Sequence, residues 1–483
     1  MAEADRPCRM RMRHLWKKVT VGITALALLA TAAGCGESVS DKDAAKTDTT
    51  AAKTEAAKEG ADQTEAKGAG AGNTEGAGKE AGAASGEAGS IKVWVSSGAE
   101  DDTYREMFTT METELNIQIN DEYYPKDELD SKIQVAPVVG DAPDMIIADY
   151  LQIPSYYEAG MIETLDDRLS AELKGDLLQS IVDESTYDGH IVSTAQFDAG
   201  MALWANKSML EGAGVRIPVS YKDAWDKAEF EDALAKLKES GVEYPIYIRQ
   251  NKPSSLYFTY MPVIASFGGD YVNRDTMLTE GVLDSEETIA AYSYITWLEE
   301  QGYLNGACDY EDAFYGRKES ALALLGHWKY TDHVTNLGDD AILVPIPDFG
   351  KGVFTCSGST VWAMTTAATE NGTADAVWSV MEAALSPEYI NQITDFNGAI
   401  PSRKSVLDAK DELKEGGRLY LYREQLEAGI SVLRPLTPAH MTIYSAMESA
   451  TSDIIGGADA GEALKDASES IDEIITENEW NLN

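Results

Sequence analysis

Strand and helix patterns alternate between residues 91 and 149, and this order constrains the fold more than any other feature of the sequence. Residues 91–95 form a β-prone run, and apolar residues then recur at spacings of three and four over residues 104–115, which is typical of one helix face. A second helix pattern lies between two further strand patterns, the last at residues 145–149. Because strands that alternate with helices pair in parallel through right-handed crossovers, the stretch predicts an open α/β sheet.

Two polar strand ends are expected at the same edge of this sheet. The strand at residues 145–149 ends in Asp149 and is followed by Tyr150, and the first strand is followed by a loop that contains Ser97 and Gly98. Ligands bind beyond the carboxyl ends of the strands in such sheets. We therefore predict that these four residues contact a ligand, the two loop residues through their backbone N–H groups. A helix N-cap at Asp149 and an ordinary turn at the loop are the alternatives.

The N-terminus has the features of an export signal. Six basic residues precede an uncharged run at residues 19–33, which is too short for a comfortable transmembrane helix. The sequence Ala-Ala-Gly-Cys at residues 32–35 resembles a bacterial lipobox, in which cleavage leaves the cysteine as a lipid-modified first residue. We expect residues 1–34 to be a signal peptide and Cys35 to be a lipid anchor. An ordinary secretory cleavage site is the alternative.

Residues 35–90 differ in composition from the rest of the chain. Ala, Gly, Glu, Lys and Thr dominate, and no aromatic residue occurs. Such a composition cannot bury a core, so we predict a disordered tether. As a flexible coil of about 56 residues, it would reach on the order of 40 Å and hold a folded body away from a membrane.

Charge and motifs exclude several classes of function. The formal net charge of −43 opposes binding to nucleic acid or to anionic lipid headgroups. The sequence contains no H-E-x-x-H, G-x-S-x-G, C-x-x-C or calcium-loop motif. We expect no catalytic residue, no cofactor and no metal. Cys308 and Cys356 remain in the body of the chain and are expected to be buried thiols, although a disulfide between them stays open.

An ordered set of short motifs resembles the extracellular solute-binding proteins of ABC importers. Within them the set falls in the maltose-binding-protein-like branch (family 1), which includes the sugar-binding lipoproteins of Gram-positive bacteria. The set begins with Gly-Asp-Ala-Pro-Asp at residues 140–144 and Tyr-Glu-Ala-Gly-Met-Ile-Glu-Thr-Leu-Asp at residues 157–166. It continues in family order with motifs at residues 197–207, 266–271, 326–328, 345–347, 357–363 and 397–403.

The resemblance implies an α/β, two-lobed periplasmic-binding-protein-like fold of type II, with discontinuous lobes joined by a hinge and a ligand cleft between them. We expect lobe 1 to comprise residues 91–196 plus 346–398, and lobe 2 to comprise residues 197–345 plus 399–483. A second block of strand and helix patterns begins at Ala202, which agrees with a second lobe.

The candidate ligand contacts follow from the chemistry of sugars, which present an apolar C–H face and a rim of hydroxyls. Trp328 follows a strand pattern and matches the tryptophan that the family stacks on sugar. Tyr257 and Tyr444 resemble further stacking residues of the family; core packing is the alternative for all three. Asp198 ends a β-like run and is expected to accept bonds from sugar hydroxyls or to brace the hinge. The remaining candidates are the small loop residues Ser357, Gly358 and Ser359, with an ordinary turn as the alternative.

The sequence thus predicts a non-catalytic, lipid-anchored monomer on the extracellular face of the cell membrane. Its partners would be a carbohydrate ligand and the membrane subunits of an ABC permease. A binding protein for a peptide or polyamine is one alternative, and an adhesion module is another. A secreted glycoside hydrolase is the third; it would use Asp149 and Asp198, which would have to lie about 5 to 9.5 Å apart.

Overall fold

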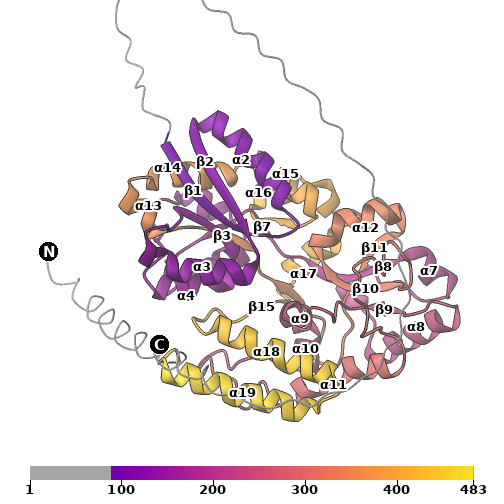
Figure 1. The fold of residues 1–483 in the computed structure, drawn as a ribbon. Coiled ribbons are helices and arrows are strands. Elements are labelled where there is room, and N and C mark those ends of the chain that lie inside the picture. Colours follow the sequence, from indigo (N-terminus) through magenta and orange to yellow (C-terminus); the bar gives the residue numbers. More distant parts are fainter. Residues whose placement is uncertain (1–88, 482–483) are drawn as a thin grey trace, which may run out of the picture. The chain divides into compact units, whose positions relative to one another are not determined.

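The computed structural model describes residues 89–481, in which a five-stranded sheet has the strand order β2-β1-β3-β13-β6 (Figure 1). These strands are β1 (Gly89–Ser96), β2 (Ile117–Tyr124), β3 (Met145–Asp149), β6 (Thr194–Ala195) and β13 (Thr360–Met364). Strand β1 pairs in parallel with β2 and β3, as the alternating patterns predicted, whereas β13 pairs antiparallel with β3 and β6. The parallel order confirms the open α/β sheet.

Helices cover both faces of this sheet. Figure 1 shows α2 (Asp101–Leu115), α14 (Ala374–Ala384) and α15 (Pro387–Asn397) on one side, and α3 (Lys126–Val139) and α4 (Ile153–Glu158) on the other.

Helix α2 buries the apolar face that its spacing predicted. Tyr104, Met107, Phe108 and Met111 are each at most 2% exposed. The rings of Tyr104 and Phe108 both lie 5.8 Å from the ring of Trp362 in β13, in edge contacts. Burying side chains of this size stabilises the fold by about 1.5–3 kcal/mol each. The helix is therefore fixed against the sheet by contacts to a strand more than 200 residues later.

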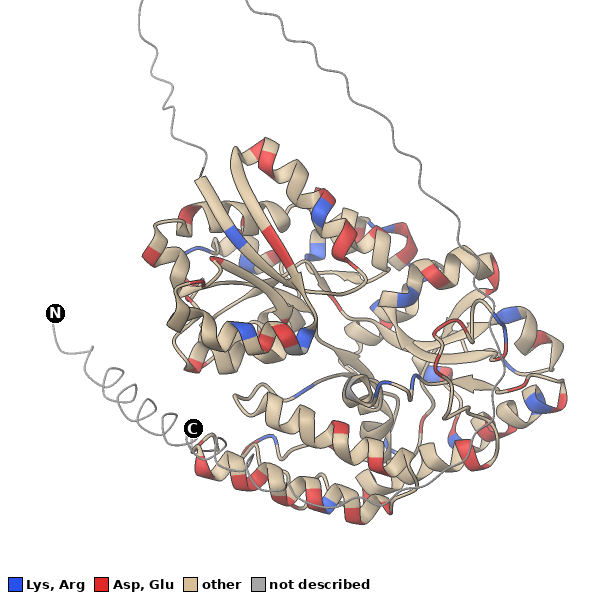
Figure 2. Ribbon diagram, in the orientation of Figure 1, with Lys and Arg blue, Asp and Glu red and all other residues tan. Residues whose placement is uncertain are grey.

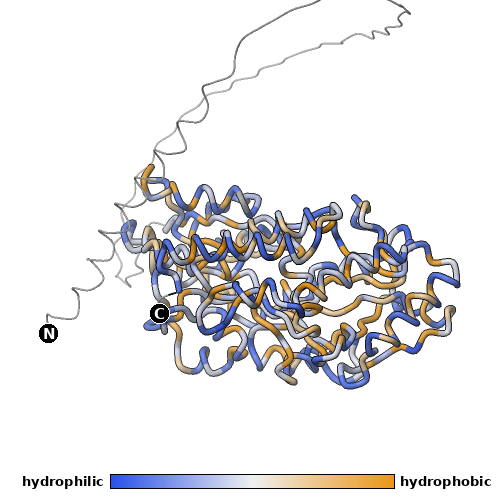
Figure 3. Tube along the Cα trace, turned by 90° about the horizontal axis from the view of Figure 1, so that it is seen from below, coloured by the Kyte–Doolittle hydropathy of each residue, from blue (hydrophilic) through white to orange (hydrophobic). Residues whose placement is uncertain are grey.

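A second, four-stranded sheet has the order β11-β8-β10-β9. Its strands are β8 (Met201–Asn206), β9 (Ile246–Tyr247), β10 (Leu322–Gly326) and β11 (Ala341–Val344). Strands β8 and β10 are buried along their whole length, because they lie at the centre of the sheet. Figure 3 shows apolar residues concentrated in the interior and hydrophilic residues along the outer helix turns.

Long helices pack beside this second sheet and near the end of the chain. Helix α18 (His440–Ile455) contacts both α19 (Ala460–Glu477) and α9 (Pro253–Thr259), and α10 (Met261–Phe267) contacts α11 (Glu286–Glu300). In α19, Leu464, Ile471 and Ile475 are fully buried and form the apolar face of this helix. The other elements of four or more residues are α5 (Ala171–Asp176), α6 (Gln179–Glu184), α7 (Lys207–Gly212), α8 (Lys227–Glu239), α12 (Tyr330–Leu337), α13 (Thr366–Asn371), α16 (Lys404–Ala409) and α17 (Tyr420–Glu427).

Two short pairs of strands lie where the chain passes between the two sheets. Strand β7 (Phe197–Asp198) pairs antiparallel with β14 (Ile400–Pro401), and β12 (Thr355–Ser357) pairs in parallel with β15 (Ser431–Leu433). The first pair lies at the expected lobe boundaries near residues 197 and 399.

The chain returns to the five-stranded sheet later than expected. Phe349 stacks on Phe267 with ring centroids 4.9 Å apart, and the backbone N–H of Lys351 donates to the carbonyl of Ser266. Both contacts join residues near 350 to α10, whereas β13 begins only at Thr360. The first part of the expected lobe 1 segment 346–398 therefore packs with elements of the expected lobe 2, because aromatic residues in it fill the space beside α10.

Other expectations concern single residues or absences. Cys308 and Cys356 are free and buried, so the prediction of buried thiols is confirmed. Within residues 89–481, no helix has the length and apolar character needed to cross a bilayer. The same part of the chain holds no group of side chains arranged for a metal ion. The predicted signal peptide, the Cys35 anchor and nearly all of the tether lie outside the described residues.

Candidate ligand-binding site

Asp149 lies at the end of β3 and is the centre of a charged group. Its side chain is 22% exposed, and its Oδ1 accepts a hydrogen bond from the backbone N–H of Leu151 at 3.1 Å, capping the turn that follows. Its Oδ2 accepts hydrogen bonds from Lys126 Nζ at 3.2 Å and from Arg434 Nη2 at 3.1 Å. The N-cap that was the alternative for Asp149 is therefore present, together with two ion pairs.

Burial and charge act in opposite directions on Asp149. Burial disfavours the ionised carboxylate, but the positive charges of Arg434 and Lys126 outweigh burial and hold the pKa of Asp149 well below its usual range. The carboxylate is consequently charged at every physiological pH.

Arg434 connects this group to aromatic side chains. Its side chain is 7% exposed, so it is buried and is not a surface charge. Its backbone N–H donates to the Tyr150 hydroxyl at 3.0 Å, and its guanidinium carbon lies 4.7 Å from the centre of the Phe258 ring. The Nε atom of Arg434 is buried and has no hydrogen-bond partner among the described residues. A cation over a ring face is stabilised by the negative charge of that face, by about 0.5–2 kcal/mol.

Two half-buried rings lie in this region, that of Phe258 next to Arg434 and that of Trp328 next to Phe258. The rings of Phe258 and Trp328 have centroids 5.8 Å apart. Trp328 lies two residues after Gly326, the last residue of β10, which is the strand-end position that the sequence predicted. A β-carbon on Gly326 would fall 2.1 Å from the Trp328 ring, so only glycine allows this ring to lie against the backbone.

Tyr444 lies on the other side of the charged group. Lys126 Nζ is 4.7 Å from the centre of the Tyr444 ring, and the His440 ring is 5.8 Å away. His440 is 1% exposed, and burial followed by the charge of Lys126 lowers the pKa of His440 well below its usual value. The imidazole is therefore neutral, and the positive charge of this part of the site comes from Lys126 and Arg434.

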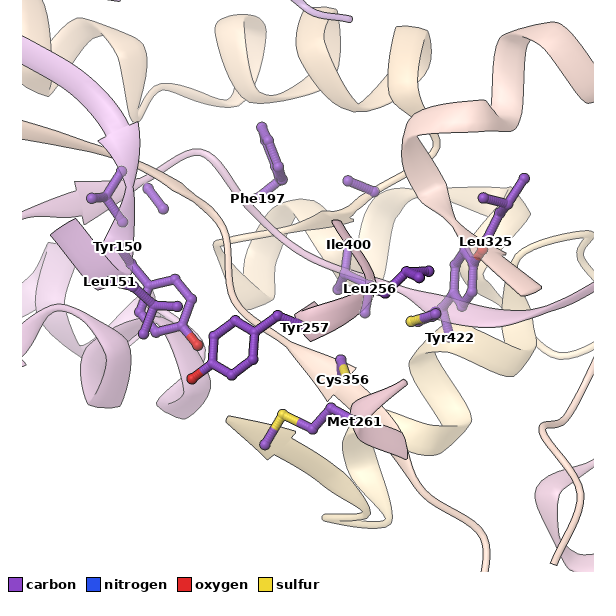
Figure 4. Packing of buried hydrophobic residues seen from close by; sticks show 14 of the residues in the cluster. Tyr150, Leu151, Phe197, Leu256, Tyr257, Met261, Leu325, Cys356, Ile400 and Tyr422 are labelled. Atoms are coloured by element: carbon purple, nitrogen blue, oxygen red, sulfur yellow. The ribbon is translucent and has the colours of Figure 1, made fainter. Parts of the chain in front are cut away.

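The rings of Tyr150 and Tyr257 lie next to the guanidinium of Arg434. Figure 4 shows their rings close together, with the hydroxyl groups toward one another. They are 0% and 1% exposed, respectively, so both pack in the core. On the same helix turn, the half-buried residue is Phe258. Phe258 and not Tyr257 is therefore the partly exposed aromatic residue of this turn.

Asp198 belongs to a separate buried cluster. It is 0% exposed, and its Oδ1 accepts a hydrogen bond from the backbone N–H of Gly358 at 3.1 Å. Ser359 in the same loop hydrogen-bonds Glu184 of α6. Burial, and then the charge of Asp198, raise the pKa of Glu184 well above its usual value. Asp198 thus holds the loop of residues 357–359 through its bond to Gly358.

The remaining loop candidates already have partners or are enclosed. The backbone N–H of Ser97 donates to the Tyr124 carbonyl at 2.8 Å, and that of Gly98 donates to Asp101 Oδ1 at 2.8 Å, although both residues are exposed. Ser357 is 2% exposed. The structure therefore brings Asp149, Trp328 and Tyr444 to one region and leaves the Ser97 loop and Asp198 outside it.

Sequence reasoning missed Lys126, Phe258 and His440 as members of this region. Lys126 begins a helix after Pro125 and looks like any surface lysine in the sequence, and the buried His440 shows no motif. Only Phe258, which adjoins Tyr257, lay within an aromatic stretch that the sequence singled out.

Comparison with known proteins gives the family. A model of bacterial extracellular solute-binding proteins matches residues 104–418. A binding protein of Brucella abortus (strain 2308) is 23% identical over 410 residues, which covers 81% of this chain and 95% of that protein.

Two solved structures share the fold. The GacH receptor of Streptomyces glaucescens GLA.O, described unliganded and in complex with acarbose, has a TM-score of 0.69 at 20% identity and covers 80% of this chain and 99% of its own. The Thermus thermophilus maltotriose binding protein, bound with maltotriose, has a TM-score of 0.67 at 17% identity and covers 80% and 100%. With a family match over more than half of its length and this two-lobed type II fold, the chain belongs to the bacterial extracellular solute-binding proteins.

Proposed function

We propose that the protein is the lipid-anchored substrate-binding component of an ABC transporter and that it captures a sugar or oligosaccharide. The observation that carries the proposal is the half-buried pair of Phe258 and Trp328 beside the ion pair of the buried Arg434 and the partly exposed Asp149. Aromatic faces pack on the apolar face of a sugar, and charged groups form strong hydrogen bonds with hydroxyls. The acarbose and maltotriose named for the two solved structures support a saccharide.

Capture is proposed to close the two lobes on the ligand. Lobe 1 would supply Lys126 and Asp149, and lobe 2 would supply Phe258, Trp328 and Tyr444. A ligand that contacts both sets binds best when they are close together, and only such a difference in affinity shifts the equilibrium toward closure. We place the lobe boundaries as the sequence did, except that the chain re-enters lobe 1 at β13.

Calorimetry against a panel of mono- and oligosaccharides tests the proposal. At least one sugar should bind, with the negative heat-capacity change that accompanies burial of apolar ring surface. If no sugar of the panel binds and a peptide or a polyamine does, the assignment to sugars is overturned.

The hydrolase alternative needs two accessible carboxylates. Asp198 is 0% exposed and its Oδ1 is bonded to the Gly358 N–H. A buried carboxylate that holds a loop is not placed to protonate a glycosidic oxygen. Turnover of a bound oligosaccharide would nevertheless favour hydrolysis, and the products of the calorimetry samples can be separated by chromatography to check for it.

The anchor is proposed at Cys35, with residues 35–90 as the link to the folded body. Cells that express the protein should incorporate a fatty-acid analogue into it, and a Cys35→Ala variant should not. Label retained by that variant would contradict a lipid anchor at this residue.

A further inference from the structure

Basic side chains gather around the candidate site although the chain as a whole is strongly acidic. The formal net charge is −43, and Figure 2 shows acidic residues along the whole of the outer helix α19. Near the rings of Phe258 and Trp328, basic side chains outnumber the acidic side chains that pair with them. One group of cations is formed by Lys126 and Arg434. The second group is formed by Arg249 and Lys252, which precede α9 in the sequence, and by Lys329, which follows Trp328.

The first of these two groups has one carboxylate for two cations. Asp149 accepts hydrogen bonds from both Lys126 and Arg434, at 3.2 and 3.1 Å. The buried Nε of Arg434 has no hydrogen-bond partner within the described part of the chain. A guanidinium presents its N–H groups in a fork that matches a carboxylate, so this unused donor is suited to an anionic oxygen.

The second group is also incompletely neutralised. Glu311 accepts hydrogen bonds from Arg249 and from Lys329, and Lys329 also donates to Asp332 at 3.0 Å. Lys252 is exposed, its backbone N–H donates to the carbonyl of Arg249, and its side chain forms no ion pair or hydrogen bond with any side chain that the structure describes. The positive charge of Arg249, and then burial and Lys329, lower the pKa of Lys252. A lysine that lies unpaired beside another cation is repelled in the free protein, and an anion would relieve this repulsion.

The two groups are connected through the aromatic rings. Arg434 lies 4.7 Å from the Phe258 ring, whose centre is 5.8 Å from that of Trp328, the residue before Lys329. A ligand that stacks on these rings would therefore have excess positive charge at both of its ends.

We propose that the captured ligand is an acidic oligosaccharide, built from uronic-acid units whose carboxylates pair with Arg434 and Lys126 at one end and with Lys252 at the other. This inference rests on the proposed function, and it specifies the class of sugar. Neutral hydroxyls would leave the excess charge of both groups uncompensated. Local cations are also needed to overcome the repulsion that a chain of this net charge exerts on an anion.

Matched pairs of ligands test the inference. Calorimetry would compare trigalacturonate and a mannuronate trisaccharide with their methyl esters, which keep the size and hydroxyls but carry no charge, and with maltotriose. At least one free acid should bind about tenfold or more tighter than its own ester, the effect expected from a charge-assisted hydrogen bond, and its affinity should fall as salt is raised.

Variants locate the effect. Lys252→Gln should weaken binding of the acid by about threefold, as expected for an exposed ion pair, and leave binding of its ester unchanged. Lys465→Gln is the control, because Lys465 is an exposed lysine on α19. The inference is overturned if esters bind as tightly as acids, if only maltotriose binds, or if Lys252→Gln weakens acid and ester equally. If no saccharide binds at all, the proposed function itself fails.

Discussion

The guanidinium of Arg434 donates to the carboxylate of Asp149 at 3.1 Å, across 285 positions of the sequence. The acid ends a strand of the five-stranded sheet, and the arginine directly follows β15, which pairs with β12. This ion pair therefore connects the end of β3 in one sheet to the short strand pair β12–β15, which lies where the chain passes to the other sheet. A movement that separates the two sheets would therefore also change the environment of the Asp149 carboxylate.

Removing the arginine should leave the largely buried carboxylate of Asp149 with Lys126 as its single cation. We expect Arg434→Met to lower the free energy of unfolding by about 2–4 kcal/mol, because the charge of Asp149 is then compensated only in part. Urea unfolding followed by circular dichroism measures this loss. The double variant Arg434→Met with Asp149→Asn should recover part of it, and a double variant as unstable as the sum of the two single changes would contradict a direct interaction.

Replacing Glu184 should change how stability depends on pH. The pKa of Glu184 is raised in the folded protein, so its protonated form is favoured there, and the stability it contributes is present below its unfolded pKa of about 4.3 and is lost as the pH rises toward the folded pKa. Glu184→Gln keeps a neutral side chain. The variant should therefore gain stability relative to the unmodified protein between pH 4 and pH 8.

Urea unfolding at pH 4, 6 and 8 gives this difference. Glu163→Gln serves as the control, because the Glu163 side chain forms no hydrogen bond or ion pair within the described part of the chain. A difference between Glu184→Gln and the unmodified protein that stays constant with pH would show that Glu184 is ionised in the fold.

The backbone at Gly326 should control the position of Trp328. A methyl group there would fall 2.1 Å from the indole ring, so Gly326→Ala should displace the ring and weaken ligand binding while the two sheets remain folded. Gly212→Ala, where no atom lies within 4 Å of the added carbon, is the matched control. Calorimetry with a sugar that binds gives the affinities, and equal affinity for both variants would mean that the ring does not contact the ligand.

The sequence was sufficient where a local pattern decides the structure. The spacing of Tyr104, Met107 and Phe108 predicted a helix face, because a helix face depends on neighbours within a few residues. The alternating order predicted the parallel pairing of β1, β2 and β3, because strands joined by helical crossovers pair in parallel. The position of Trp328 after β10 followed from the strand pattern and a glycine.

Longer-range relations could not be predicted in this way. Asp149 and Arg434 meet only when β3 and β15 are folded, and no pattern links them in the sequence. Tyr257 and Phe258 differ by one position on a seven-residue helix, which turns a side chain by about 100°. A helix this short does not reveal which of its aromatic residues faces the core. Phe349 likewise joins α10 through tertiary packing, so the return to lobe 1 was expected too early.

The central claim is that a sugar packs on the half-buried rings of the site, and titration of two tryptophan variants with one bound sugar tests it most directly. Trp328→Ala should lose about 2 kcal/mol of binding free energy, from roughly 80 Å² of apolar ring surface at about 25 cal/mol per Å². Trp378→Ala, at a tryptophan that is also partly buried but lies on α14, should bind as the unmodified protein does. Unchanged affinity in Trp328→Ala would contradict the account.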